Sequence, residues 1–128
     1  MVTSVTNLGR SGLSDWLIQR VTAIVLLAYI VFLLIVMADS SLDYAQWQQL
    51  FAQTWVRIFS VAALLSIVMH AWVGIWCVAT DYFTPYVLNL KLGPFFGSIA
   101  TILRLSFLAA SAIVLFIYVV WGIQILWS

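Results

Sequence analysis

Three long runs without an acidic side chain, lysine or arginine constrain the fold of this chain more than any other feature. A transmembrane helix needs about 20 mostly apolar residues, and a helix satisfies its own backbone hydrogen bonds in lipid. The alternation of polar and apolar residues that a membrane barrel would need is absent. The sequence therefore predicts an all-α membrane protein that forms a single domain over residues 1–128. The runs cover residues 21–38, 58–80 and 105–127, and they predict transmembrane helices at about 16–38, 57–83 and 102–127.

Composition excludes several classes of protein. Hydrophobic residues make up 66% of the chain and charged residues 7%, which excludes a soluble globular domain. The net charge is only +1 and no cluster of Lys or Arg exists, so nucleic acid is not an expected partner. Cys77 is the only cysteine, and no internal disulfide can form. The N-terminal residues lack the character of an organelle transit sequence, which favours a bacterial protein.

The ends of the predicted spans carry start and stop signals. Residues 1–12 are polar and contain two glycines, which is typical of an irregular arm. Ser14 follows, and its hydroxyl can cap the first helix. The first run is too long for the apolar part of a signal peptide, so we expect it to be retained. Pro85 discourages helix in the residue before it, and residues 85–98 are expected to form a loop.

The segment between the first two spans differs from them in composition. Ser40 and Asp43 resemble a capping box with Asp in place of the usual Glu or Gln. Aromatic residues then recur at helical spacing with glutamines between them. Two interpretations remain open at this point: a short helix near residues 41–54 that lies in the membrane interface, or a hydrated loop with aromatic anchors.

Basic residues predict the orientation in the membrane. Cytoplasmic flanks of membrane proteins carry an excess of Lys and Arg. The first connection holds only Arg57, whereas the N-terminal side and the second connection hold the remaining four cations. We therefore expect the N-terminus and the second connection to face the cytoplasm and the C-terminus to face the periplasm. The four cations are Arg10, Arg20, Lys91 and Arg104.

The only histidine, His70, lies near the middle of the second run. An ionisable group inside a span is costly and indicates a functional site. Three interpretations are open: a packing histidine bonded to a neighbouring helix, a proton relay, or an axial ligand of haem iron. Small side chains on its helix face would give a neighbouring helix or a flat ligand close access. If the ligand is haem with two histidines, the second must come from another polypeptide. The small residues on this face are Ala63, Ser66, Gly74 and Cys77.

Three further residues could take part in chemistry at a membrane boundary. Asp81 follows His70 by eleven residues, so the two lie within roughly 20° of one helix face and ~16 Å apart along the axis. Asp81 and Tyr82 are either ordinary polar residues of a helix end, or an acid and a phenol that could bind and protonate a quinone carbonyl. Arg20 is either a boundary anchor or a partner for a carboxylate such as a haem propionate.

With these residues in place, the chain resembles a known family: the small hydrophobic membrane anchors of bacterial succinate dehydrogenase (succinate:quinone reductase, complex II). The resemblance covers most of the chain, and its most specific part is the pattern H-A-W-x-G followed by D-Y. The matching residues are Leu8-Gly9-Arg10, Asp15, Arg20-Val21-Thr22-Ala23-Ile24-Val25-Leu26, His70-Ala71-Trp72-Val73-Gly74 and Thr80-Asp81-Tyr82.

This resemblance implies specific roles and partners. His70 would be one axial ligand of a haem b whose iron takes its second ligand from a second membrane anchor, with which the spans would form a helical bundle. Tyr82 would hydrogen-bond a ubiquinone carbonyl beside Asp81, and Arg20 would lie near the haem propionates. An iron-sulfur subunit and a flavoprotein subunit would hold the iron-sulfur clusters and the FAD. The assembly would sit in the bacterial inner membrane and serve the respiratory chain and the tricarboxylic acid cycle.

Two other functions remain open from the sequence. The chain could anchor a fumarate reductase or be another small b-type cytochrome, which the preferred direction of turnover would distinguish. Alternatively, it could be a non-catalytic membrane assembly protein in which His70 only packs against a neighbouring helix. In either case the chain would not be catalytic alone.

Overall fold

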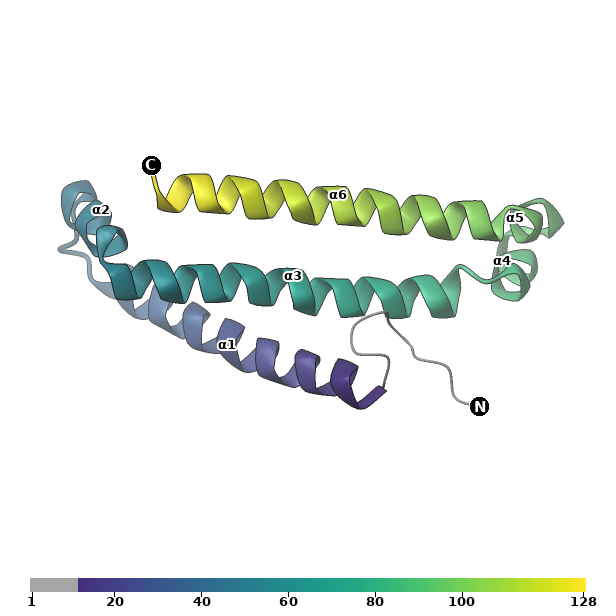
Figure 1. Cartoon of the computed structure of the whole chain (residues 1–128), viewed down its shortest axis with the longest axis horizontal. Coiled ribbons are helices and arrows are strands. Elements are labelled where there is room, and N and C mark those ends of the chain that lie inside the picture. The colour runs from purple at the N-terminus through teal and green to yellow at the C-terminus, as the bar shows by residue number, and fades with distance from the viewer. Residues whose placement is uncertain (1–11) are drawn as a thin grey trace.

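The computed structural model describes residues 12–128 as a row of helices (Figure 1). The irregular arm expected at residues 1–12, the Leu8-Gly9-Arg10 motif and the charge of Arg10 lie outside the described residues, apart from Gly12. Along the described part of the chain the elements are α1 (Gly12–Ala38), α2 (Tyr44–Ala52), α3 (Thr54–Tyr82), α4 (Pro85–Leu92), α5 (Pro94–Ser98) and α6 (Ala100–Leu126).

The three predicted spans are confirmed. Helices α1, α3 and α6 are long and apolar enough to cross a membrane. Helix α3 lies in the middle, with α1 packed along one side and α6 along another (Figure 1). The prediction that Ser14 caps the first helix is wrong, because α1 begins at Gly12 and places Ser14 inside the first turn. The helix begins four residues before the predicted span start at about residue 16, so α1 extends beyond its apolar run at the N-terminal end.

The connection between α1 and α3 contains a helix, which confirms the helical interpretation of residues 41–54. Its capping box is not the predicted one. Asp43 is the N-cap of α2 and accepts a hydrogen bond from the backbone N–H of Gln46 at 2.8 Å, while the Gln46 side chain accepts from the Asp43 N–H at 3.1 Å. Asp43 therefore caps α2 itself, and Ser40 lies in the preceding turn. The position of α2 in the membrane interface stays a prediction.

The prediction of a loop at residues 85–98 is wrong, because the segment folds into α4 and α5. Pro85 does end α3 as expected, but a proline also suits the first position of a following helix. Thr84 caps α4 by accepting a hydrogen bond from the Val87 N–H at 3.3 Å. Gly93 then separates the two short helices with φ of 104°, a conformation that glycine adopts readily.

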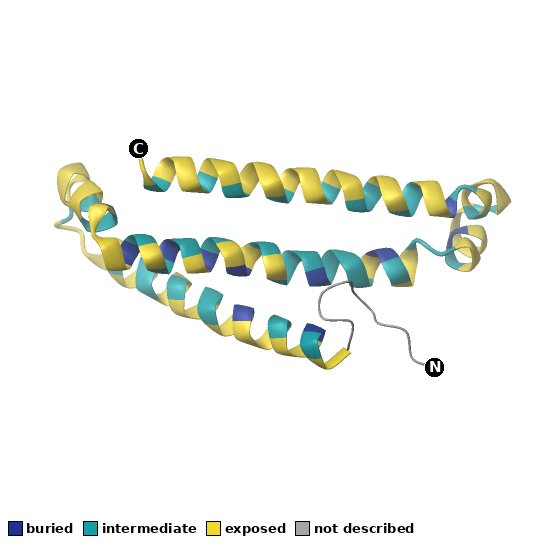
Figure 2. Cartoon of the chain, viewed as in Figure 1, coloured by how far each residue is buried: buried dark blue, intermediate teal, exposed yellow. Residues whose placement is uncertain are grey.

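Buried residues gather on α3 (Figure 2). They are mostly small or β-branched, as expected where helices approach closely in a membrane. By contrast, α1 and α6 leave most of their large apolar side chains exposed, which suits lipid or a partner subunit. The buried residues of α3 are Val56, Ser60, Ala63, Ser66, Val73 and Ala79.

One hydrogen bond joins α1 to α3 near the α2 end of the bundle. The Tyr29 hydroxyl and the Ser60 hydroxyl are 2.7 Å apart, and Ser60 is buried. The Tyr29 ring also packs edge-on against Phe59, with ring centroids 5.1 Å apart. This contact holds the two helices together in the half of the pair that is nearer to α2.

We expect Tyr29→Phe to weaken the contact between α1 and α3. The substitution keeps the ring and removes the phenol, which leaves the buried Ser60 hydroxyl without its partner. The free energy of unfolding should fall by about 1 kcal/mol in an SDS titration of the full chain. Tyr118→Phe, which changes an exposed tyrosine of α6, is the matched control and should leave the value unchanged. Equal values for both variants would contradict this assignment.

Candidate functional site

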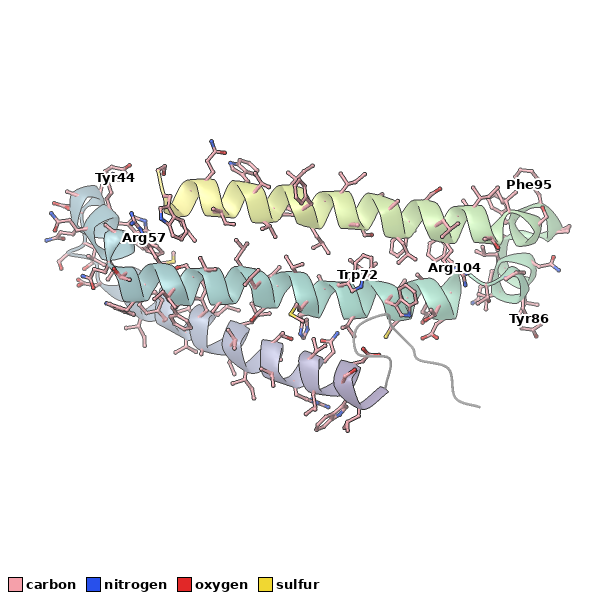
Figure 3. All side chains as sticks on the ribbon, viewed as in Figure 1. Tyr44, Arg57, Trp72, Tyr86, Phe95 and Arg104 are labelled. Carbon is pink, nitrogen blue, oxygen red and sulfur yellow. The ribbon has the colours of Figure 1, made fainter. Side chains whose placement is uncertain are left out.

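His70 lies in the middle of α3 and faces α1. Its imidazole Nδ1 is 3.0 Å from the Thr22 hydroxyl oxygen. Trp72, two residues further along α3, projects on the side of α6 (Figure 3), as the helical rotation of about 200° over two residues requires. The side chain of His70 is half-buried, whereas Thr22 is buried.

The hydrogen bonds of Thr22 favour a proton on Nδ1 of His70. Thr22 Oγ1 lies 2.5 Å from the backbone carbonyl of Ile18, so its single proton is donated there. The same oxygen can then only accept from His70, which places a proton on Nδ1. A neutral imidazole with a proton on Nδ1 keeps its lone pair on Nε2. With the proton on Nδ1, Nε2 carries the lone pair that a metal ligand needs.

A second hydrogen bond fixes the backbone beside the histidine. The amide of Gln19 donates to the carbonyl oxygen of His70 at 3.0 Å. Gln19 and Thr22 are three residues apart on α1, so they lie on the same helix face. Together they bind both the ring and the backbone of His70. Sequence reasoning missed both residues, although each is a polar side chain near the start of a long apolar helix.

The small-residue face around His70 receives α1. Ala63 and Ser66 are buried, while Gly74 and Cys77 are half-buried. Gly74 follows His70 by one helical turn, and a Cβ added there would meet no atom of residues 12–128 within 4 Å. Close approach to a helix is thus confirmed at one end of this face, and open space lies beside the other.

Asp81 and Tyr82 end α3, away from His70. Both side chains are exposed, and Tyr82 is 61% exposed. Eleven residues of helix separate Asp81 from His70, so the two groups share a face but do not touch. A phenol and a carboxylate at this helix end can therefore contact a ligand that approaches from outside the chain.

Arg20 does not join the other candidate residues. Its guanidinium carbon lies 5.5 Å from the centroid of the Trp16 ring, one turn earlier on α1. Arg20 precedes Thr22 by two residues, and its side chain leaves α1 about 200° away from the His70 contact. Among residues 12–128 no group of three or more His, Cys, Asp or Glu side chains could hold a metal ion. Among residues 12–128, His70 would be the single side-chain ligand of a metal at this site.

Comparison with known proteins identifies related chains. A family model described as succinate dehydrogenase/fumarate reductase transmembrane subunit matches residues 4–103. A relative from Coxiella burnetii, named succinate dehydrogenase hydrophobic membrane anchor subunit, is 32% identical over 124 residues. This match covers 96% of the present chain and 95% of the relative.

We expect the imidazole of His70 to be the Nδ1-protonated tautomer in the protein without added ligand. Because the chain has one histidine, ¹⁵N-histidine labelling of this chain reports a single residue. The Thr22→Val variant removes the hydroxyl acceptor and should shift the ¹⁵N signals towards a mixture of tautomers. Thr80→Val is the control, because Thr80 bonds only to carbonyls of its own helix, at 3.0 and 3.1 Å. A spectrum of Thr22→Val identical to that of the unmodified chain would disprove the role of Thr22.

Proposed function

Because the chain belongs to the family of succinate dehydrogenase/fumarate reductase transmembrane subunits, we propose that it anchors a succinate:ubiquinone oxidoreductase and provides part of a haem b site and part of a quinone site. It attaches an iron-sulfur subunit and a flavoprotein subunit to the bacterial inner membrane. The oxidation of succinate takes place at FAD in the flavoprotein, so this chain is not catalytic alone.

The observation that carries the haem proposal is the hydrogen bond between His70 and Thr22. It leaves the lone pair of His70 on Nε2, as an axial ligand requires, and it holds the ring in one orientation. The space beside Gly74 gives a flat macrocycle access to this face. Haem b supplies one-electron redox chemistry when bound. Because this chain has one histidine, a second histidine ligand to the haem would come from a second membrane anchor.

The quinone proposal depends on the exposed end of α3. Tyr82 carries a phenol that donates a hydrogen bond to a ubiquinone carbonyl. Asp81, next to it, exchanges protons with water and supplies them as the quinone is reduced. Both groups face outward from this chain, which leaves room for the iron-sulfur subunit to complete the site.

For Arg20 we propose a contact with a haem propionate. A guanidinium binds a carboxylate through two parallel hydrogen bonds. The contact requires the side chain to leave the Trp16 ring and swing towards the α3 side of α1. An exposed cation–π pair is worth only about 0.5–1 kcal/mol, which a charged hydrogen bond can offset.

We also propose an orientation in the membrane. The excess of Lys and Arg beside the N-terminus and in the second connection supports a cytoplasmic position for Asp81 and Tyr82 and a periplasmic C-terminus. The iron-sulfur subunit would dock on the cytoplasmic face. The family description also includes fumarate reductase, and the named relative favours the succinate dehydrogenase assignment.

Replacing His70 tests the haem site. His70→Leu removes the only imidazole of the chain, and we expect the purified complex to lose most of its haem absorbance or to show a changed spectrum. An unchanged spectrum would exclude His70 as a ligand.

Thr22→Val should keep the haem but raise its reduction potential, because a hydrogen-bonded imidazole is a more basic ligand that favours oxidised iron. A complex that contains no haem at all would favour a non-catalytic assembly role.

Replacing Tyr82 tests the quinone site. Tyr82→Phe keeps the ring but removes the phenol donor, so reduction of ubiquinone by succinate should fall about tenfold. Reduction of a soluble dye should be largely retained, because the dye takes its electrons before they reach the quinone. Tyr86→Phe, which changes an exposed tyrosine of α4, is the matched control. Equal loss of both activities in Tyr82→Phe would instead indicate a defect in assembly.

A further inference from the structure

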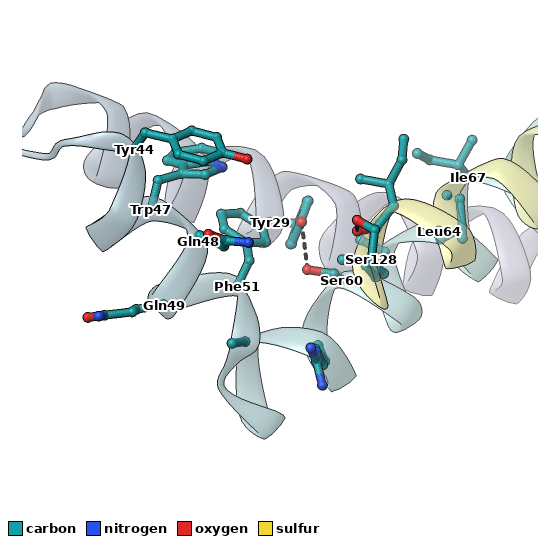
Figure 4. A pocket seen from close by; sticks show the side chains of 16 residues that line it. Tyr29, Tyr44, Trp47, Gln48, Gln49, Phe51, Ser60, Leu64, Ile67 and Ser128 are labelled. Carbon is teal, nitrogen blue, oxygen red and sulfur yellow. Dashed lines mark hydrogen bonds between the residues drawn. The ribbon is translucent and has the colours of Figure 1, made fainter.

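A cavity of about 670 Å³ lies at the end of the bundle opposite to Asp81 and Tyr82 (Figure 4). All three spans and α2 contribute to its walls. Arg57, in the first turn of α3, borders it. Arg57 precedes Tyr82 by twenty-five residues of one helix, which corresponds to about 37 Å. This cavity is therefore separate from the proposed quinone site. Its lining reaches Ile67, one turn before His70, but does not include His70 itself.

The lining of the cavity is mixed in polarity beside α2 and apolar towards Leu64 and Ile67. Figure 4 shows Tyr44, Trp47 and Gln48 of α2 on one side, and Leu64 and Ile67 on the other. Along α3, Leu64 and Ile67 lie about 10 and 15 Å further from the helix start than Arg57 does. A ligand that follows this gradient has a polar end at the membrane boundary and an apolar part directed towards the membrane interior.

Arg57 indicates the charge of the polar end. Its Nε atom is buried and has no hydrogen-bond partner among the described residues. The guanidinium carbon is 5.5 Å from the centroid of the Trp127 ring, so the ring holds the group in place without accepting its hydrogens. A buried N–H of a cation without an acceptor is costly. Arginine binds phosphate especially well, through two parallel hydrogen bonds.

We propose that this cavity binds an anionic phospholipid. Its phosphate accepts hydrogen bonds from the guanidinium of Arg57, and its acyl chains lie along Leu64 and Ile67. Arg57 also borders a smaller hollow of about 360 Å³, which is lined by Trp127 as well and gives room for the headgroup. An uncharged amphiphile or an apolar helix from a partner subunit would leave the charge of Arg57 unpaired, and a zwitterionic lipid would bring a cation together with its phosphate. The proposal does not depend on haem or quinone binding.

Lipid retention by the assembled complex tests the proposal. The complex is placed in nanodiscs made of equal parts of phosphatidylglycerol and phosphatidylcholine, released, and weighed by native mass spectrometry. We expect phosphatidylglycerol to be retained in preference to phosphatidylcholine, and Arg57→Gln to reduce that preference about tenfold. Arg57→Lys keeps the charge and should retain the preference. Arg104→Gln removes a cation at the other end of the bundle and should behave as the unmodified protein. An unaltered preference in Arg57→Gln, or no preference in the unmodified complex, would overturn the proposal.

Cross-linking from α2 identifies the occupant even if Arg57→Gln fails to assemble. Benzoylphenylalanine in place of Gln48, an exposed residue that lines the cavity, should give an adduct with the mass of phosphatidylglycerol on illumination. The same group in place of Ala45, which is exposed and does not line the cavity, is the control and should give little of this adduct. An adduct between Gln48 and a partner subunit, or a quinone, would overturn the proposal.

Discussion

The hydrogen bond between Thr22 and His70 is the interaction on which the rest of this structure depends. Inside a membrane a polar side chain without a partner is costly, so the imidazole determines which face of α3 is turned to α1. Gln19 bonds the same residue through its backbone, and Tyr29 with Ser60 repeats the arrangement nearer α2. Three polar contacts along one pair of helices fix both their rotation and their register.

The two sides of α3 make different kinds of contact with their neighbours. Towards α1 the contact combines hydrogen bonds with aromatic packing, whereas towards α6 it is mostly apolar. Gly122 of α6 shows how tight that second contact is, because a Cβ added there would lie 2.9 Å from a methyl carbon of Leu64. Packing of this kind fills space well but specifies rotation less strictly than hydrogen bonds do. The hydrogen bonds towards α1 thus fix the position of His70, whereas the packing towards α6 adds a third span.

The spans could be predicted from sequence because lipid requires long apolar helices, and so could the place of His70 within α3. The missed features depend on neighbours that a periodic pattern does not show. The sequence pattern at Pro85 predicts only the end of a helix. In the structure the Thr84 hydroxyl caps a new helix that begins at Pro85. Spacing places the capping box at Ser40, while the amide that completes it belongs to Gln46. Thr22 and Gln19 could not be found in this way, because the partner of His70 depends on how α1 is rotated against α3.

The order of synthesis gives the contact between α1 and α3 a consequence for biogenesis. Thr22 precedes His70 by 48 residues, so the hydroxyl that pairs with the imidazole is synthesised before the imidazole. Helix α6 is made last, and the hydrogen bonds of His70 within residues 12–128 come from α1. Both partners of His70 are therefore present in the chain before α6 is synthesised.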